Sequence, residues 1–490
     1  MQKREIAWPI SRVRFGHARS DMTPPVGIFN RLWGAARHDR ANGIHRLLYA
    51  DVLTFGELGQ KDVFMARVEI DLCGLVAPVH ARMVRAVANA LGVPTSRVIL
   101  TGSHTHSAGH LVSPESASTL PGGDLIGPYH HRLEEILVDA ARRAAASMRD
   151  ATISYGMGRC DLAHNRDCWD DVAQCFVTGL NPGVPADDTV LVGRVTDSSG
   201  QIVTTLVNYG CHPTTLAWEN DLISPDYVGA MRETVEGATG VPCVFLLGAC
   251  GDLGPRHGFV GDTAIADRNG RQLGHAALSA LDALEPPETE YVYQGPVVSG
   301  ATLGRWDSQP ISATRQKESA QLGGSTFSVD LALKPKPSRT QLESDLAMWL
   351  QRQMDADAID DRIAARNAGA QAERARRWLT RIADLPDSST FPLRFAVFRL
   401  GDAVWITCAG EPYSQIQAEL RSRFPDKTIV FSPLAFDLQV AYLLPHDRYG
   451  VGLYQEEPSI LAAGCLELFT DAIAGRVTEV LAEQFVTTTR

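Results

Sequence analysis

The chain has 490 residues, of which 44% are hydrophobic and 21% are charged. This is the composition of a folded globular protein, and at roughly 150 residues per domain the length fits about three cores or one large α/β domain with insertions. The 46 Lys and Arg are outnumbered by 57 Asp and Glu, a formal net charge of −11, which argues against a nucleic-acid partner because phosphate backbones attract cationic surfaces.

Membrane and export signals are not found in the sequence. The most apolar short run, residues 241–250, is far below the roughly 20 residues that span a bilayer. The first ten residues lack the apolar stretch of a secretory signal, and the nine cysteines contain no C-x-x-C pair. We therefore expect a cytoplasmic protein with reduced thiols and no membrane partner.

The first half of the chain alternates segments typical of strands with segments typical of helices. This alternation predicts an α/β fold, with a mixed central β-sheet flanked by helices. Functional sites in such sheets gather beyond the carboxyl ends of the strands. The segments are strands at 62–70, 98–101, 202–208 and 241–247, a helix at 79–91, and a helix that begins at Ser224-Pro225.

The second half contains a predicted helical insertion within a single catalytic domain, residues 1–490. Residues 305–388 are expected to be mostly helical, and the apolar spacing of Leu342, Leu346 and Trp349 places these side chains on one helix face. The charged remainder of the segment is typical of a solvated face, with a lid or an oligomer contact as the functional alternative. A strand pair around Gly401-Asp402, a strand at 428–431 and a closing helix at 460–485 follow.

The densest histidine cluster follows the predicted strand at 98–101. His104 and His106 form an H-x-H pair within residues 101–110, and such a pair at a strand end suits a metal, because the rigid backbone fixes one imidazole while the other can serve a second role. The alternative is a pair of polar histidines near the surface. A metallo-β-lactamase signature is excluded because Ala108 stands where that pattern requires aspartate.

Two more candidates lie after predicted strands. His212 precedes Pro213, which stiffens the backbone and favours a fixed ligand geometry, although a single loop histidine is also compatible with a structural role. Glu411 lies between a predicted strand and a helix start. Its alternative role is a carboxylate that complements the helix dipole.

Together these residues resemble the neutral (non-lysosomal) ceramidase family of zinc-dependent amidases, over roughly residues 11–485. The similar pieces occur in the family's order. They are Asp-Met-Thr-Pro-Pro at 21–25, Gly-Ile-His at 43–45, Ser-His-Thr-His-Ser at 103–107, Asn-Arg at 165–166, His-Pro-Thr at 212–214, Leu-Ile-Ser-Pro-Asp-Tyr at 222–227, Gly-Asp at 251–252, Gly-Glu at 410–411 and a tyrosine-rich stretch at 442–454.

The resemblance implies one zinc ion per chain and a set of catalytic groups around it. His106 corresponds to the general acid/base, and Arg166 and Tyr454 correspond to the groups that stabilise the developing oxyanion. Nitrogen and oxygen ligands of this kind are what a catalytic zinc requires, together with an open position for water. The implied ligands are His104, His212, Glu411 and Tyr442.

Departures from the family pattern refine the expected function. Gly254 stands where the family motif has a serine, which excludes a serine nucleophile there. The chain ends after one predicted helix, so we expect no C-terminal immunoglobulin-like domain, and no export signal is recognised. We therefore expect hydrolysis of a carboxamide C–N bond in a small or medium soluble molecule, through a zinc-activated water, rather than of membrane ceramide.

Two alternatives remain open from the sequence. An esterase or lactonase could use the same metal site, since an activated water attacks esters as readily as amides. A non-catalytic, metal-stabilised binding protein is the other alternative, and the presence of His106, Arg166 and Tyr454 beside the ligands argues against it, because a structural zinc site requires only its ligands. The oligomeric state is left open, with a homo-oligomer as one option.

Overall fold

The computed structural model describes residues 5–109, 113–436 and 438–483. Its largest sheet has parallel pairs at its two edges and antiparallel pairs between them. In spatial order the eight strands are β14 (Cys243–Leu247), β12 (Ile202–Tyr209), β11 (Thr189–Asp197), β7 (Arg149–Arg159), β2 (Ile10–Asp21), β4 (Tyr49–Gly56), β5 (Met65–Ile70) and β6 (Val98–Gly102).

A second sheet packs on one face of the first. The two sheets share one apolar core, in which Phe55 of the first sheet lies edge-on to Trp405 of the second with ring centroids 5.5 Å apart. The helices α9 (Gln415–Arg423) and α10 (Cys465–Ala482) cover the outer face of the second sheet. Its strands are β18 (Leu322–Ala332), β19 (Thr390–Leu400), β20 (Ala403–Cys408) and β22 (Thr428–Ser432).

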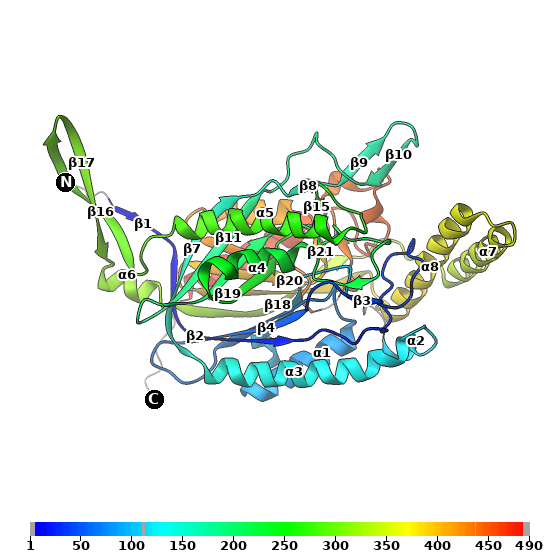
Figure 1. Ribbon diagram of the computed structural model, residues 1–490, viewed down its shortest axis with the longest axis horizontal. Coiled ribbons are helices and arrows are strands. Elements are labelled where there is room, and N and C mark those ends of the chain that lie inside the picture. The colour runs from blue at the N-terminus through cyan, green and yellow to red at the C-terminus, as the bar shows by residue number, and fades with distance from the viewer. Residues whose placement is uncertain (1–4, 110–112, 437, 484–490) are drawn as a thin grey trace.

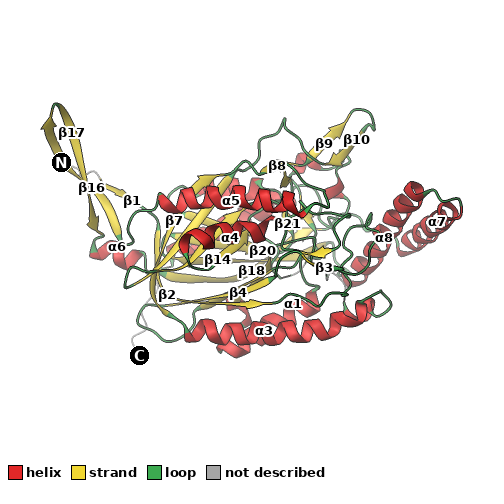
Figure 2. Cartoon of the chain, viewed as in Figure 1, coloured by secondary structure: helices red, strands yellow, loops and turns green. Residues whose placement is uncertain are grey.

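Two pairs of helices cover the opposite face of the large sheet (Figures 1 and 2). The helices α1 (Ala77–Leu91) and α3 (Ile126–Ala146) lie against β2, β4 and β6, and α4 (Tyr227–Thr239) and α5 (Thr263–Asp282) lie against β7, β11 and β14. Helix α1 buries one face, which carries Val79, Met83 and Val87. It ends at Gly92, whose φ of 68° is the left-handed conformation that glycine adopts without strain. The molecule therefore has four layers, with two sheets between helices.

Smaller pieces extend from these layers or connect them. A three-stranded sheet of β1 (Glu5–Ala7), β16 (Thr289–Ser299) and β17 (Ala301–Pro310) protrudes at one end, and the helices α7 (Arg339–Ala358) and α8 (Arg362–Asp384) protrude at the other (Figure 1). The remaining elements are the paired strands β3 (Gly43–Ile44) with β13 (Leu222–Ile223), β8 (Ala163–Asn165) with β15 (Leu253–Pro255), β9 (Asp167–Asp170) with β10 (Cys175–Thr178), and β21 (Glu411–Pro412) with β23 (Tyr442–Leu443), together with the short helices α2 (Pro114–Ala117) and α6 (Ala313–Glu318).

The predicted α/β class is confirmed, and one predicted helix start is wrong. Helix α4 begins at Tyr227 rather than at Ser224-Pro225. Asp226 has a φ of 56°, a backbone conformation that cannot continue a right-handed helix, and its side chain accepts a hydrogen bond from the backbone N–H of Tyr227. The other strands and helices predicted in the first half occur within a few residues of their expected ends.

The segment 305–388 contains more than helices. Residues 305–310 complete β17, and β18 pairs along its whole length with β19, from Leu322 opposite Leu400 to Ala332 opposite Thr390. The protruding helical hairpin is residues 339–384. A role of this segment as a lid or an oligomer contact stays a prediction. Among the described residues, no helix is long and apolar enough to cross a bilayer.

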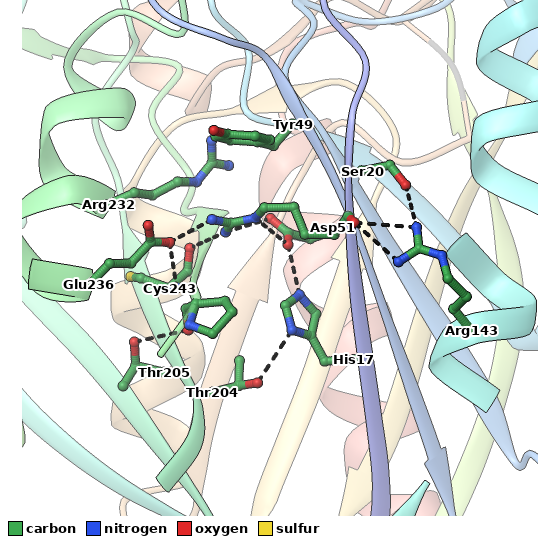
Figure 3. A network of polar contacts seen from close by, with 12 residues as sticks. His17, Ser20, Tyr49, Asp51, Arg143, Thr204, Thr205, Arg232, Glu236 and Cys243 are labelled. Atoms are coloured by element: carbon green, nitrogen blue, oxygen red, sulfur yellow. Dashed lines mark hydrogen bonds and ion pairs between the residues drawn. The ribbon is translucent and has the colours of Figure 1, made fainter. Parts of the chain in front are cut away.

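A buried charged network connects the large sheet to α4 (Figure 3). The carboxylate of Asp51 is fully buried and accepts hydrogen bonds from His17, over 2.7 Å, and from two nitrogens of Arg19, over 2.8 and 3.0 Å. Arg19 also pairs with Glu236 of α4 and donates to the carbonyl of Cys243 on β14. Burial alone would raise the pKa of Asp51, but Arg19 and His17 hold that pKa well below its usual range.

We expect Asp51→Ala to lower the free energy of unfolding by about 3–5 kcal/mol, because it leaves buried cationic and imidazole groups without their acceptor. Urea unfolding followed by intrinsic fluorescence measures the change. Asp139→Ala is the matched control, since Asp139 pairs with Arg143 on the exposed side of α3 and its loss should cost less than about 1 kcal/mol. Equal stabilities of the two variants would contradict a stabilising role for the network.

Candidate metal centre

His104 lies two residues beyond the end of β6, in a backbone conformation with φ of 68°. Its Nδ1 lies 2.6 Å from the carbonyl oxygen of Cys73, which follows β5, the neighbouring strand of the sheet. A carbonyl oxygen can only accept, so Nδ1 carries the proton and Nε2 presents a lone pair. That lone pair points toward Glu411, whose Oε2 lies 3.3 Å from Nε2.

His212 is oriented in the same way after β12. Its Nδ1 lies 2.6 Å from the carbonyl oxygen of Cys250 and 3.2 Å from that of Leu253. Its Nε2 lies 2.9 Å from Oε2 of Glu411. Both imidazoles therefore present Nε2 to the same carboxylate oxygen, with their orientation fixed by backbone carbonyls that come from other strand ends.

Glu411 lies three residues beyond the end of β20, a strand of the second sheet. It begins β21, a two-residue strand that pairs in parallel with β23 and places Glu411 opposite Tyr442. The loop after Glu411 is held by the buried Asp252, which accepts from the backbone N–H and the hydroxyl of Ser414, over 2.6 and 2.9 Å. The backbones at Gly251 and Glu411 approach each other closely. A Cβ on Gly251 would lie 2.6 Å from the carbonyl oxygen of Glu411, so only glycine fits at position 251.

The donor set fits a zinc ion. The ligand atoms of His104, His212 and Glu411 all lie within 4.8 Å of one another, and two imidazole nitrogens with a carboxylate oxygen are ligands that catalytic zinc accepts. Burial alone would raise the pKa of Glu411, but His104 and His212 hold it well below its usual range, so the carboxylate is charged. The ring of Tyr442, the fourth predicted ligand, lies 6.4 Å from that of His212, centroid to centroid.

His106 lies beside the ligands without being one of the three clustered donors around Glu411. Its Nε2 is 3.4 Å from Nε2 of His104, and its ring packs against Trp33 with centroids 5.1 Å apart. Burial lowers the pKa of His106 well below its usual range, and the neighbouring His104 and His212 lower it further. The imidazole is thus neutral at pH 7 and able to accept a proton next to the metal position.

Arg166 is a buried cation fixed by the loop before β15. Its Nε and Nη2 donate to the carbonyl oxygen of Gly251, over 3.2 and 2.8 Å, and Nη2 also donates to the hydroxyl of Tyr442 over 3.2 Å. Burial opposes its charge, but Tyr442 and Glu411 outweigh this and raise the pKa of Arg166. The guanidinium is a rigid hydrogen-bond donor beside Tyr442.

Tyr454 lies at the opening of the site. Its ring centroid is 6.0 Å from that of Tyr442, and 52% of the residue is exposed. The next residue, Gln455, is buried and donates to Asp167 over 2.8 Å, which fixes the short helix that carries Tyr454. The structure therefore brings Tyr454 into the same region as the other six predicted residues, at its solvent side.

Several residues of the site were not predicted from the sequence. The thiol of Cys73 lies 3.4 Å from Nδ1 of His104. Trp33 packs on His106 and also contacts the rings of Trp218 and Phe259, with centroids 6.2 and 5.8 Å apart. These residues come from distant loops and share no spacing with the histidine motifs, so no sequence pattern singled them out.

The base of the helical hairpin borders the site. On α8, Arg377 donates to the carbonyl of Leu32, next to Trp33, and Trp378 donates to the carboxylate of Glu457, close to Tyr454. His110, the last histidine of the cluster at 101–110, lies outside the described residues. Asp226 and Asp252 hold a helix start and a loop.

Residues 13–242 match the family model described as neutral/alkaline non-lysosomal ceramidase, N-terminal. This part of the chain is similar to the neutral ceramidases. A curated neutral ceramidase from Pseudomonas aeruginosa is 24% identical to it over 251 residues, which make up 49% of this chain and 37% of that protein. The matched part of this ceramidase is thus little more than a third of its length.

Two solved ceramidase structures share the fold. Neutral ceramidase from Pseudomonas aeruginosa has a TM-score of 0.64 at 15% identity, covering 96% of this chain and 74% of that one. A ceramidase complexed with C2 has a TM-score of 0.63 at 16% identity, covering 98% and 77%. Of the predicted site residues, the ceramidase family match includes His104, His106, Arg166 and His212, whereas Glu411, Tyr442 and Tyr454 lie beyond residue 242.

We expect purified protein to contain about one zinc per chain and His212→Ala to lose it. The imidazole of His212 is oriented by the carbonyl groups of Cys250 and Leu253, and no neighbouring side chain can take its place as a ligand. Elemental mass spectrometry measures the metal content. His106→Ala should keep its metal, and His275→Ala, which removes an exposed histidine of α5, is the matched control. Metal retained by His212→Ala at the level of the control would contradict the assignment.

Proposed function

We propose that the protein is a zinc-dependent hydrolase that cleaves a carboxamide C–N bond of a small or medium soluble molecule. The observation that carries this proposal is the convergence of Nε2 of His104, Nε2 of His212 and Oε2 of Glu411 beside a partly buried, neutral His106. The match to the neutral ceramidases supports amide chemistry, since a ceramidase is named for cleaving an amide.

We assign the zinc ligands to His104, His212, Glu411 and Tyr442, with one zinc per chain. When bound there, zinc would polarise a carbonyl group and lower the pKa of a water molecule toward neutrality. His106 is in place to take a proton from the attacking water and to deliver it to the leaving amine. Its neutral state at pH 7 is what the first of these transfers requires.

Arg166 and Tyr454 are assigned to stabilise the carbonyl oxygen as it gains negative charge. The guanidinium of Arg166 is already anchored through Nε and Nη2, so it loses little freedom when it donates to a substrate oxygen. Gly254 contributes no hydroxyl, and the residues that act on the substrate in this proposal are therefore those around the metal.

An esterase or lactonase acting through the same residues is the second candidate function, because nothing in the donor set discriminates a leaving alcohol from a leaving amine. A non-catalytic metal-binding protein is the third candidate function. The buried Arg166, which donates to the hydroxyl of Tyr442, argues against it, because a structural zinc site requires only its ligands. A single catalytic domain over residues 1–490 and a cytoplasmic location stay predictions.

We expect the zinc-loaded protein to hydrolyse N-acyl amides at a higher kcat/KM than the esters of the same acyl groups. A panel of paired amide and ester substrates, from short acyl chains to ceramide, measures this preference by release of the acid. Hydrolysis of esters alone would favour the esterase. Efficient hydrolysis of ceramide, with none of the short amides, would contradict the proposed substrate size.

We expect His106→Ala to lower kcat about 10²–10⁴-fold with its zinc content unchanged, because it removes the group that transfers the proton. Steady-state kinetics on the best amide substrate, together with metal analysis of the same sample, measures both quantities. His275→Ala again serves as the control. A His106→Ala variant with normal turnover would show that another group transfers the proton.

We expect Arg166→Gln to lower kcat about 10²–10³-fold, by analogy with the loss of one donor to a developing oxyanion. Gln keeps polar character at the buried position but removes the charge. The kinetic measurement is the same, and zinc content is measured alongside because Arg166 also contacts Tyr442. A loss explained entirely by lost zinc would contradict a direct role in stabilising the oxyanion.

A further inference from the structure

Arginine residues gather on the part of helix α8 that borders the site. Arg374, Arg377 and Arg381 recur at intervals of three and four residues, so they lie along one side of the helix. The protein as a whole is acidic, with a formal net charge of −11. This row of cations beside the metal position is therefore a local exception to the charge of the chain.

Two of these arginines already have acidic partners. The Nε of Arg374 lies 2.6 Å from Oε1 of Glu457, and the same oxygen accepts a hydrogen bond from the indole of Trp378. The Nε of Arg377 lies 3.1 Å from Oε1 of Glu373. The carboxylates of Glu457 and Glu373 are thus occupied by arginines other than the third one.

Arg381 has no acidic partner. Among the residues that the structure describes, none accepts a hydrogen bond from its guanidinium group or forms an ion pair with it. The guanidinium carbon lies 5.2 Å from the ring centroid of Trp378, and this cation–π contact restrains the position of the group. The side chain is partly exposed, so a molecule from solvent can reach it. Five N–H donors without a protein acceptor suit an incoming anion.

A short series of contacts connects Arg381 to the opening of the site. Trp378, on which Arg381 stacks, donates to Glu457 over 2.6 Å. The backbone N–H of Glu457 donates in turn to the carbonyl oxygen of Tyr454 over 3.1 Å. Burial lowers the pKa of this arginine, whereas Glu457, Tyr454 and Glu411 oppose the shift. An arginine stays protonated at neutral pH, so Arg381 is a cation at the solvent side of the metal position.

We infer that Arg381 binds an anionic group of the substrate, such as a carboxylate, while the amide to be cleaved lies at the metal position. This inference rests on the proposed function and narrows its substrates to amides that also carry a negative charge, a combination found in N-acyl amino acids. Two carboxylate oxygens match the planar fork of a guanidinium group. The exposed Arg377, one turn away, adds positive charge beside it.

The first test compares substrates that differ only in charge. We expect the zinc-loaded protein to hydrolyse N-hexanoylglycine at about 10–100-fold higher kcat/KM than N-isobutylhexanamide, in which a neutral isopropyl group replaces the carboxylate. A second pair, N-hexylsuccinamate and N-hexyl isocaproamide, moves the charge from the amine side to the acyl side. A preference for the charged member of either pair supports the inference and locates the charge. Equal kcat/KM within both pairs would overturn it.

The second test assigns the preference to Arg381. We expect Arg381→Gln to lower the ratio of the two kcat/KM values about tenfold or more, and Arg381→Lys, which keeps the charge but not the fork, to lower it less. Arg362→Gln is the matched control, because Arg362 begins the same helix and pairs with Asp360 at its far end. A purely structural role would lower both substrates equally and leave the ratio unchanged. The same ratio in Arg381→Gln and in the control would contradict the inference.

A binding measurement separates this inference from the proposed function. Calorimetric titration of the zinc-loaded His106→Ala variant with N-hexanoylglycine should give about tenfold weaker binding when Arg381→Gln is added, and the difference should shrink as salt is raised. If binding depends on Arg381 in this way but no amide or ester is hydrolysed, the proposed function fails and the anion site stands. If Arg381→Gln leaves binding unchanged, the carboxylate lies elsewhere, for example on the zinc, and the inference is overturned.

Discussion

The carboxylate of Glu411 between the imidazoles of His104 and His212 is the interaction on which the candidate site depends. A buried carboxylate is costly unless it is paired. Here both partners follow strands of the large sheet, whereas Glu411 follows β20 of the second sheet. The pairing therefore requires that the two sheets pack in one register. The shared apolar core that joins them is also what places the three donors within 4.8 Å of one another.

Backbone carbonyl groups, rather than other side chains, set the chemistry of the two imidazoles. Each Nδ1 faces a carbonyl oxygen at 2.6 Å, from Cys73 for His104 and from Cys250 for His212. A carbonyl oxygen cannot change its protonation, so the orientation and the tautomer are fixed by the fold itself. A backbone carbonyl group also fixes the orientation of Arg166, whose guanidinium donates to the carbonyl oxygen of Gly251.

Local patterns were sufficient for one helix and several strands of the first half, because buried strands and one-sided helices leave a clear period in the sequence. Helix α1 and the strands β5, β6, β12 and β14 show this agreement. The start of α4 was misplaced because Ser224-Pro225 is a good helix start locally, whereas the tertiary contacts of Asp226, which also accepts from Leu216, impose a positive φ. The separate second sheet was not foreseen, since β18 and β19 are divided in sequence by the helical hairpin.

The sequence by itself determined which residue types were available for a site: histidines after two strands, a carboxylate after a third, and an arginine and tyrosines in motifs shared with a family. The tertiary structure decided their geometry, because residues as far apart in the sequence as His104 and Tyr454 meet only when the two sheets pack together. It also decided features without any motif, namely Trp33 on His106 and the Cys73 carbonyl behind His104. Such contacts depend on the distances between loops, and a linear sequence carries no signal for a distance that only packing creates.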